Sequence, residues 1–144
     1  MLLKNMPCNF DRKNNDIGSL CVAESNSDAV PFLIKRVYYI YDVSSGVIRG
    51  HHAHKTLEQI LICVKGAIEI TLDNGRGNIE SIKLDDPSVG LYVGPSMWRT
   101  MKWLKDNSVL LVLASEHYQA SDYIRDYEEF LTWVRKGDSH ADTI

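Results

Sequence analysis

Residues 46–66, with the sequence GVIRGHHAHKTLEQILICVKG, decide the fold class of this 144-residue chain. Three of the five histidines of the chain lie inside this stretch, within four consecutive positions. Successive side chains of a strand alternate between the two faces of a sheet, so His52 and His54 share one face and His51 takes the other. The composition of residues 59–64 predicts a further strand shortly after the histidines. We therefore expect paired imidazoles on one face of a barrel strand, where they can hold a metal or transfer protons.

The rest of the chain is typical of a protein built mainly from strands. Segments rich in β-branched and aromatic residues, or continuously apolar, alternate with turn residues such as Asp73-Asn74-Gly75. The predicted strands are residues 19–24, 34–43, 59–64, 67–72, 78–84, 90–93 and 109–114, with residues 1–16 as an arm or a short first strand. Many short strands with turns at short intervals indicate a closed or double-sheet β architecture. The expected fold class is all-β, and a small barrel with an internal pocket is a natural place for a ligand site.

One helix is predicted after the strands. Ser121 is a good N-cap residue, and Gly137 is expected to end the helix. Apolar residues recur between them at the spacing of one helical face, at Ile124, Tyr127, Leu131 and Val134. We therefore expect a single domain over residues 1–137 and a disordered tail over residues 138–144.

Composition and charge are those of an ordinary soluble globular protein. Hydrophobic residues make up 44% and charged residues 24%. The net charge is −3 and the basic residues are scattered, which argues against a nucleic-acid partner. No stretch approaches the roughly 20 apolar residues that cross a bilayer, and the first residues lack the apolar core of a signal peptide. The three cysteines match no zinc pattern, and reduced thiols fit a cytoplasmic location.

The spacing of the glycines and histidines resembles the first motif of the cupin superfamily. That motif runs from a glycine through H-x-H and a glutamate ligand to a second glycine. Gly46, His52, His54 and Gly66 match it, while Gln59 stands at the position of the glutamate. The resemblance implies a cupin-type jelly roll and poses the question of a metal.

The ligand set argues against a metal. Arg99 stands where the second cupin motif places a histidine, shortly after Gly94-Pro95. A guanidinium has no lone pair to donate, and its positive charge repels a cation. Two histidines fall short of the three protein ligands usual at a catalytic zinc site. We expect a metal-free pocket; the alternative is that Glu58, next to Gln59, supplies a third ligand.

Two histidines and a fixed cation in such a pocket suit proton transfer beside a carbonyl group. Histidine has an ordinary pKa near 6.5, so it accepts and returns protons at neutral pH. An enediolate intermediate carries negative charge, which preorganised donors stabilise. Arg99, Tyr38 and the second histidine can serve as those donors.

Five stretches form a sharper set of motifs than the cupin pattern, and they are residues 34–40, 49–55, 89–95, 113–115 and 122–125. Together they resemble the sugar 3,4-ketoisomerases that act on dTDP-4-keto-6-deoxyglucose, over about residues 17–130. The resemblance implies a dTDP-linked 4-keto-6-deoxyhexose as substrate, an enediol intermediate and no cofactor. It also implies a jelly-roll homodimer, in which N-terminal strands can be exchanged, and a role in making 3-amino-6-deoxysugars.

The resemblance also implies roles for individual residues. His52 is similar to the base that removes the proton from C3, and His54 to the group that shuttles protons between the oxygens on C3 and C4. Tyr38 is similar to a pocket residue close to the reacting sugar. The substrate-binding residues expected are Arg49, Lys55, Arg99 and Gln59. Of these, Arg49 and Lys55 are assigned by charge, as contacts to the diphosphate or the pocket edge.

Two positions bear on the configuration of the product. Arg99 places the chain with the arginine type of the family, which resembles the enzymes that yield 3-keto-6-deoxyglucose rather than its galactose epimer. Ile17 stands where the family can carry a polar tyrosine or arginine that reaches the pocket. Other functions stay open: a nucleotide-sugar 3,5-epimerase, a non-catalytic sugar-binding cupin and, more distantly, a metal-dependent dioxygenase.

Overall fold

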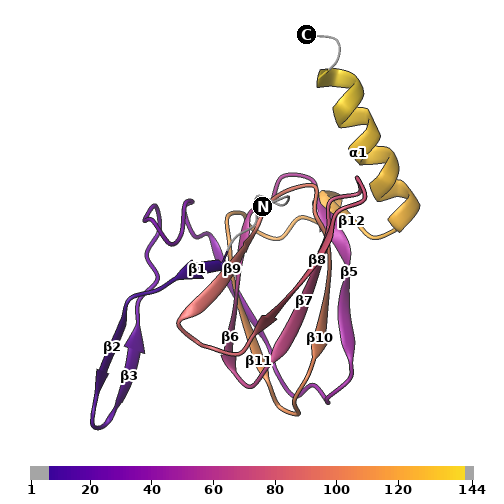
Figure 1. Cartoon of the computed structure of the whole chain (residues 1–144). Coiled ribbons are helices and arrows are strands. Elements are labelled where there is room, and N and C mark those ends of the chain that lie inside the picture. Colours follow the sequence, from indigo (N-terminus) through magenta and orange to yellow (C-terminus); the bar gives the residue numbers. More distant parts are fainter. Residues whose placement is uncertain (1–6, 142–144) are drawn as a thin grey trace.

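The computed structural model describes residues 7–141, which form two facing sheets, a separate hairpin and a C-terminal helix (Figure 1). The first sheet has, in spatial order, β1 (Pro7–Asn9), β9 (Val89–Val93), β6 (Gln59–Lys65), β11 (Val109–Ala114) and β4 (Arg36–Ile40). The second has β12 (Tyr123–Ile124), β5 (Ile48–His54), β10 (Trp98–Trp103), β7 (Ile68–Asp73) and β8 (Ile79–Leu84). The remaining elements are the hairpin of β2 (Arg12–Asn15) and β3 (Gly18–Cys21), the 3₁₀ turn η1 (Ala120–Asp122) and the helix α1 (Tyr127–Ala141).

All the pairings between these strands are antiparallel. Strands far apart in the sequence are neighbours in both sheets, for example β5 beside β10 and β4 beside β11. Long crossovers of this kind are characteristic of the jelly roll. The prediction of an all-β, cupin-type jelly roll with a C-terminal helix is confirmed.

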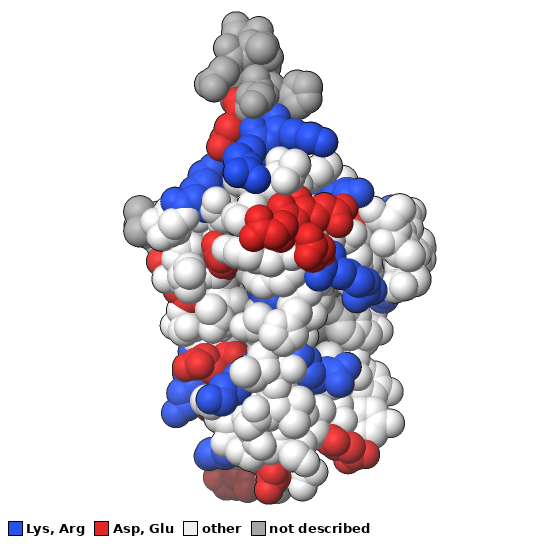
Figure 2. Space-filling view, turned by 90° about the vertical axis from the view of Figure 1, so that its right-hand side faces the viewer, with Lys and Arg blue, Asp and Glu red and all other residues white. Residues whose placement is uncertain are grey.

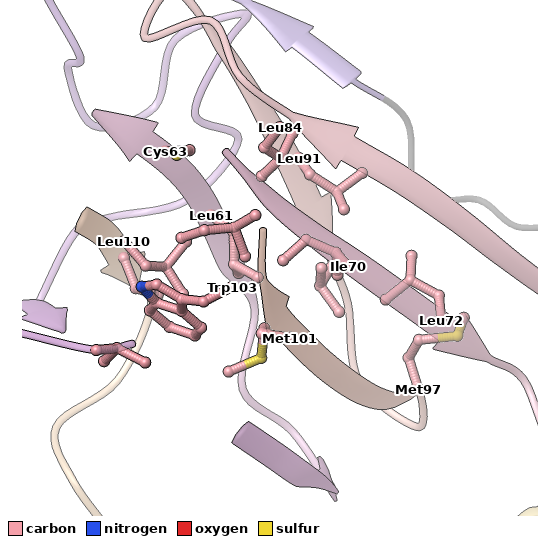
Figure 3. Close-up of a cluster of buried hydrophobic side chains, with 14 residues drawn as sticks. Leu61, Cys63, Ile70, Leu72, Leu84, Leu91, Met97, Met101, Trp103 and Leu110 are labelled. Atoms are coloured by element: carbon pink, nitrogen blue, oxygen red, sulfur yellow. The ribbon is translucent and has the colours of Figure 1, made fainter. Parts of the chain in front are cut away.

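Alternating side chains fill the space between the two sheets. Along β7, Ile68, Ile70 and Leu72 are buried, whereas the residues between them are partly exposed. This is the period of two that a strand shows when one face is covered. Figure 3 shows Ile70 and Leu72 with Leu61 of β6 and Trp103 of β10, in one cluster to which both sheets contribute.

The outer faces of β6 and β11 are covered in part. Phe10, Val30 and Phe32 from the N-terminal part pack against Ile60, Ile62 and Leu113. Strands buried on both faces have no polar face to display, so they are apolar without alternation. The prediction of a strand over residues 109–114 is confirmed, but its outer face is covered only at one end, because Val109 and Leu111 are partly exposed.

Every predicted strand overlaps an observed one, and the histidine pair lies on β5 as expected. The sequence analysis missed β10 and β12. The inward-facing residues of β10 are Arg99, Met101 and Trp103, which are buried. An arginine at an inward position interrupts the apolar alternation by which strands are predicted.

The predicted helix begins and ends at the wrong residues. Tyr123 and Ile124 pair with β5 instead of entering the helix. Asp126 is the actual cap: its Oδ2 accepts the Glu129 amide proton at 3.0 Å, which satisfies a donor of the first turn. Gly137 lies inside α1, which continues to Ala141, so the helix does not end at Gly137. The disorder of the tail stays a prediction. Residues 142–144 of the predicted tail lie outside the described residues.

The helix α1 packs on the outer face of the second sheet. Phe130 and Val134 are buried against Ala53 of β5, and Trp98 packs beside them. Acidic residues lie in the first turn of α1, where they complement the helix dipole. Figure 2 shows a group of acidic side chains on this face, with basic side chains both above and below it. Among residues 7–141, no helix is long and apolar enough to span a bilayer.

Candidate active site

A β-bulge in β5 directs the two histidines into the molecule. The register between β5 and β10 shifts where His51 has no partner, and Arg99 then pairs with His52. Gly50 and His51 have positive φ angles of 96° and 53°. Such a bulge re-aims the side chains that follow it. His51 is exposed, whereas His52 and His54 are 9% and 0% exposed, as the alternation predicted.

His54 is held by a carboxylate that the sequence analysis did not assign to the site. Its Nδ1 lies 2.9 Å from Oδ2 of Asp122. The other oxygen of Asp122 accepts bonds from the Thr56 amide, at 2.8 Å, and from the Thr56 hydroxyl, at 3.0 Å. Both oxygens of this carboxylate are therefore fixed by contacts with β5 and the loop after it.

The two imidazoles lie edge to face, with ring centroids 4.9 Å apart. The Nε2 atoms of both His52 and His54 are buried and have no hydrogen-bond partner. The Tyr123 ring lies over the pair, 4.4 Å from the His54 centroid and 5.2 Å from that of His52. Buried ring nitrogens normally find partners, so two unpaired ones at one place indicate a site for a ligand.

A buried hydrogen-bond chain lies beside the histidines. Arg99 donates through Nε and Nη2 to the Met97 carbonyl, at 3.2 and 2.8 Å, and through Nη1 to Oε1 of Gln59, at 2.5 Å. Gln59 then donates through Nε2 to Tyr38 Oη at 2.9 Å. Arg99 and Gln59 are almost fully buried. The chain links β10, β6 and β4, so both sheets contribute to the site.

Burial and the guanidinium together keep both imidazoles neutral. Burial, followed by the charge of Arg99, lowers the pKa of His52 from 6.5 to about 4. The same causes lower the pKa of His54, although the Asp122 carboxylate opposes them. Burial lowers the pKa of Arg99 only to about 10, so the guanidinium stays charged at neutral pH. The site thus combines two neutral bases with one fixed positive charge.

A cavity of about 300 Å³ gives access to this cluster. Of the predicted site residues, Tyr38, His52 and Arg49 line it. His54 contacts the lining residues His52 and Tyr123, while Gln59 and Arg99 are joined to the cavity through the Tyr38 hydroxyl. Larger hollows occur elsewhere on the described residues, but they contain no histidine and only exposed carboxylates. We therefore assign the site by its chemistry rather than by cavity size.

Lys55 lies apart from this cavity. Its ammonium group is 5.6 Å from the centroid of the Trp133 ring, on α1. The structure places two other cations at the cavity instead, Arg36 and Arg125. Arg36 lies 5.4 Å from the Tyr38 centroid, and Arg125 lies 4.2 Å from that of Tyr123.

Asp122, Tyr123 and Arg125 were missed because their segment was assigned to the helix. In β12, Tyr123 pairs with His54 and Ile124 with Ala53, so Tyr123 faces the site and Ile124 faces α1. Tyr123 is aromatic and Ile124 is β-branched, which is a strand signal, although two residues are too few for a firm assignment.

The residues present do not fit a bound metal ion. Glu58, the alternative third ligand, accepts a hydrogen bond from the Tyr92 hydroxyl at 2.7 Å. Tyr92 belongs to the outer cluster of the first sheet, so this carboxylate faces away from the histidines. Within residues 7–141, no group of three or more His, Cys, Asp or Glu side chains is placed to hold a metal. The buried charge of Arg99 beside both imidazoles also repels a cation.

The family described as FdtA: WxcM-like, C-terminal, matches residues 3–135. The chain belongs to this family. This FdtA-family chain is 45% identical, over 134 residues, to the TDP-4-oxo-6-deoxy-alpha-D-glucose-3,4-oxoisomerase of Aneurinibacillus thermoaerophilus. The comparison covers 93% of the chain and 95% of that relative.

Two solved structures are similar to the FdtA-family chain over nearly their whole length. One is a variant of the 3,4-ketoisomerase QdtA from Thermoanaerobacterium thermosaccharolyticum in complex with TDP-4-keto-6-deoxyglucose. Its TM-score is 0.89 at 42% identity, covering 94% of this chain and 97% of that one. The other is the TDP-quinovose 3,4-ketoisomerase WlaRB of Campylobacter jejuni. Its TM-score is 0.84 at 47% identity, with 90% and 98% covered.

Proposed function

We propose that this chain is an isomerase that converts TDP-4-keto-6-deoxyglucose into the 3-keto sugar nucleotide. The observation that carries the proposal is the pair of unpaired Nε2 atoms beside a buried guanidinium at one cavity. The relatives support the substrate class, because one is named a 3,4-oxoisomerase and another was solved with TDP-4-keto-6-deoxyglucose.

The reaction needs two proton relocations, and the site holds two bases for them. Nε2 of His52 takes the proton from C3, and the electron pair of that C–H bond forms the C3–C4 double bond of an enediolate. Nε2 of His54 takes the hydroxyl proton from the oxygen on C3 and gives it to the oxygen on C4. The protonated His52 then returns its proton to C4. One hydrogen thus moves from C3 to C4, and another moves between the two oxygens.

The neutral state of both rings is what this sequence of steps requires. A general base works only while unprotonated, and the lowered pKa values keep His52 and His54 in that form at neutral pH. The positive charge of Arg99 disfavours an imidazolium in the empty site. It also stabilises the negative enediolate that forms when His52 becomes charged.

Tyr38 supplies the hydrogen bond to the sugar oxygen. A guanidinium can only donate, so Arg99 fixes the Gln59 carbonyl as an acceptor and its amide as the donor to Tyr38. The Tyr38 oxygen therefore accepts from Gln59, and its own proton is left to donate into the cavity. Burial raises the pKa of Tyr38, which keeps that proton in place.

We assign no metal to the reaction. Gln59 and Arg99 occupy two positions at which the cupin motifs place ligands, and they are bonded to each other. The sugar oxygens are held by hydrogen-bond donors and a fixed charge instead.

The cations at the cavity fit the diphosphate of the substrate. Arg36, Arg49 and Arg125 line the same cavity as His52. Nε of Arg36 is buried and has no hydrogen-bond partner, so it is available to a ligand oxygen. Arginine binds phosphate oxygens through paired donors, and three of them match a double negative charge. Arg49 keeps its predicted role here, whereas Lys55 lies outside the cavity.

The product we propose has the gluco configuration at C4. Arg99 is the residue that suggested this branch of the family. The 47% identity to a TDP-quinovose 3,4-ketoisomerase supports it, since quinovose is 6-deoxyglucose. In this structure Ile17 lies at the turn of the β2–β3 hairpin, away from the cavity of its own chain.

We further propose a homodimer. The β2–β3 hairpin projects from the body of the molecule, and all its residues are exposed (Figure 1). A two-stranded hairpin is at best marginally stable alone in water, so it needs a surface to cover. Apolar residues are exposed both on the hairpin and on β4, namely Ile17, Leu20, Val37 and Tyr39. A second copy of the chain, which offers the same surfaces, is the partner that fits. The cytoplasmic location stays a prediction.

The substitution His52→Asn tests the assignment of the base. Asparagine is polar and smaller than histidine, but it cannot accept a proton from carbon. We expect turnover of TDP-4-keto-6-deoxyglucose to fall by at least about 100-fold, the scale of general base catalysis, while the sugar nucleotide still binds. Stopped assays by NMR and titration calorimetry measure the two quantities. Near-wild-type turnover would show that His52 is not the base.

A further inference from the structure

We propose that Asp122 is a positioning residue of the active site, which holds His54 in the Nδ1–H tautomer and leaves its Nε2 lone pair for the substrate. The inference rests on the proposed isomerase function. An ionised carboxylate can only accept hydrogen bonds, so the 2.9 Å contact with Nδ1 places the ring proton there. Nε2 of a neutral ring is then a lone pair, and it is the atom that lacks a partner.

The Asp122 carboxylate is buried and held in place by several hydrogen bonds. Asp122 is 8% exposed, and the Thr56 amide and hydroxyl both donate to Oδ1 while Oδ2 faces His54. The Asp122 carbonyl also accepts the Lys55 amide proton at 2.9 Å, which ties η1 to the end of β5. Although burial acts against it, the bonds from Thr56 and His54 lower the pKa of Asp122, so the carboxylate is charged. The two bonds from Thr56 to Oδ1 hold the carboxylate so that Oδ2 faces the imidazole.

The two histidines differ in the charge of their hydrogen-bond partners. His52 has a hydrogen bond to the backbone of Gly50, which is neutral, whereas His54 has a carboxylate. A proton that rests on His54 forms an ion pair with Asp122, and no such partner exists for His52 among the groups that face it. The other groups around His54 are Arg99 on β10 and Tyr123 on β12. The residue that carries a proton between two oxygens is thus the one with a counter-ion.

The substitution Asp122→Asn tests this role, with Asp73→Asn as a matched control. Asp73 is equally buried and both of its oxygens accept hydrogen bonds, from the Tyr127 hydroxyl and the Gly75 amide, but it does not line the cavity. Histidine side-chain ¹⁵N NMR identifies the tautomer of each ring, and steady-state kinetics separate kcat from KM. In the wild type we expect His54 as the Nδ1–H tautomer. In Asp122→Asn we expect Nε2–H to appear and kcat to fall about 100-fold or more, with KM changed less than about threefold.

The control variant should keep the wild-type tautomer and kcat. An Nε2–H tautomer of His54 in the wild type would overturn the inference, whether or not the protein isomerises the sugar. So would wild-type kcat in Asp122→Asn, or an equal loss of kcat in both variants with the tautomer unchanged. If the wild type leaves TDP-4-keto-6-deoxyglucose unaltered, the proposed function fails, while the NMR measurement still decides the position of the proton.

Discussion

At the scale of single residues, burial beside a guanidinium sets the pH range in which His52 is neutral. Its pKa is about 4 in the folded protein, against 6.5 for the ordinary imidazole. Between these values the unfolded chain binds more protons than the native one. The free energy of unfolding therefore falls as the pH falls from 6.5 towards 4. Above pH 6.5 the contribution of His52 to that free energy is complete.

This linkage gives a prediction for stability. Lowering the pH from 7 to 5 should reduce the free energy of unfolding by roughly 2 kcal/mol through His52 alone. Urea denaturation of the wild type and of His52→Asn at both pH values measures the difference. The variant should lose correspondingly less stability. Parallel losses in the two proteins would show that His52 titrates normally in the native state.

At the scale of the element, the bulge in β5 positions the site. Gly50 has a φ angle of 96°, which favours glycine, and an added Cβ would lie 3.0 Å from the Arg99 carbonyl oxygen and 3.1 Å from Met101 Sδ. A side chain there strains the backbone and pushes on β10 at the point where Arg99 pairs with His52.

We therefore predict that Gly50→Ala destabilises the fold by about 1–3 kcal/mol and lowers kcat by about tenfold or more. The matched control is Gly137→Ala, in α1, where an added Cβ meets nothing within 4 Å. That change should stabilise the fold by up to about 1 kcal/mol, because alanine is the better helix former. Thermal unfolding and kinetics on both variants check the pair, and a harmless Gly50→Ala would contradict the role of the bulge.

The elements also show which parts of the structure are readable from the sequence. The histidine pair was predictable because a period of two fixes the face of each side chain. The apolar runs of β6 and β11 were predictable because one face of each strand is buried between the sheets and part of the other is covered by the N-terminal residues. The helix start was not, because Tyr123 and Ile124 carry an apolar spacing that suits a helix as well as a strand. Pairing with β5 decides between the two. Asp122 was hidden by the same ambiguity, since only the fold brings it to His54.

At the scale of the whole molecule, the exposed apolar surface is where the proposed homodimer can be tested. Tyr39 on β4 is 62% exposed, and Ile17 at the hairpin turn is 94% exposed. A hollow of about 580 Å³ lies beside Tyr39 on the outer face of the first sheet. Apolar surface of this kind is typical of an interface rather than of a free face.

We predict that the protein sediments at twice the 16.4 kDa mass of the chain. Tyr39→Glu should shift it towards the monomer, because a charge in an apolar interface is left without water or a partner. Ile79→Glu, at a position 64% exposed on β8 of the other sheet, should leave the mass unchanged. Sedimentation equilibrium measures all three proteins. A wild-type monomer at micromolar concentration would refute the dimer.

In the proposed reaction, two neutral imidazoles at one cavity move a ketone along a sugar ring. The decisive measurement is NMR of TDP-4-keto-6-deoxyglucose incubated with the protein. We expect a carbonyl carbon at C3, a new hydrogen at C4 and an unchanged configuration at C5. A carbonyl that remains at C4 would contradict it, whether C5 is inverted, as by an epimerase, or the sugar is bound and returned unaltered.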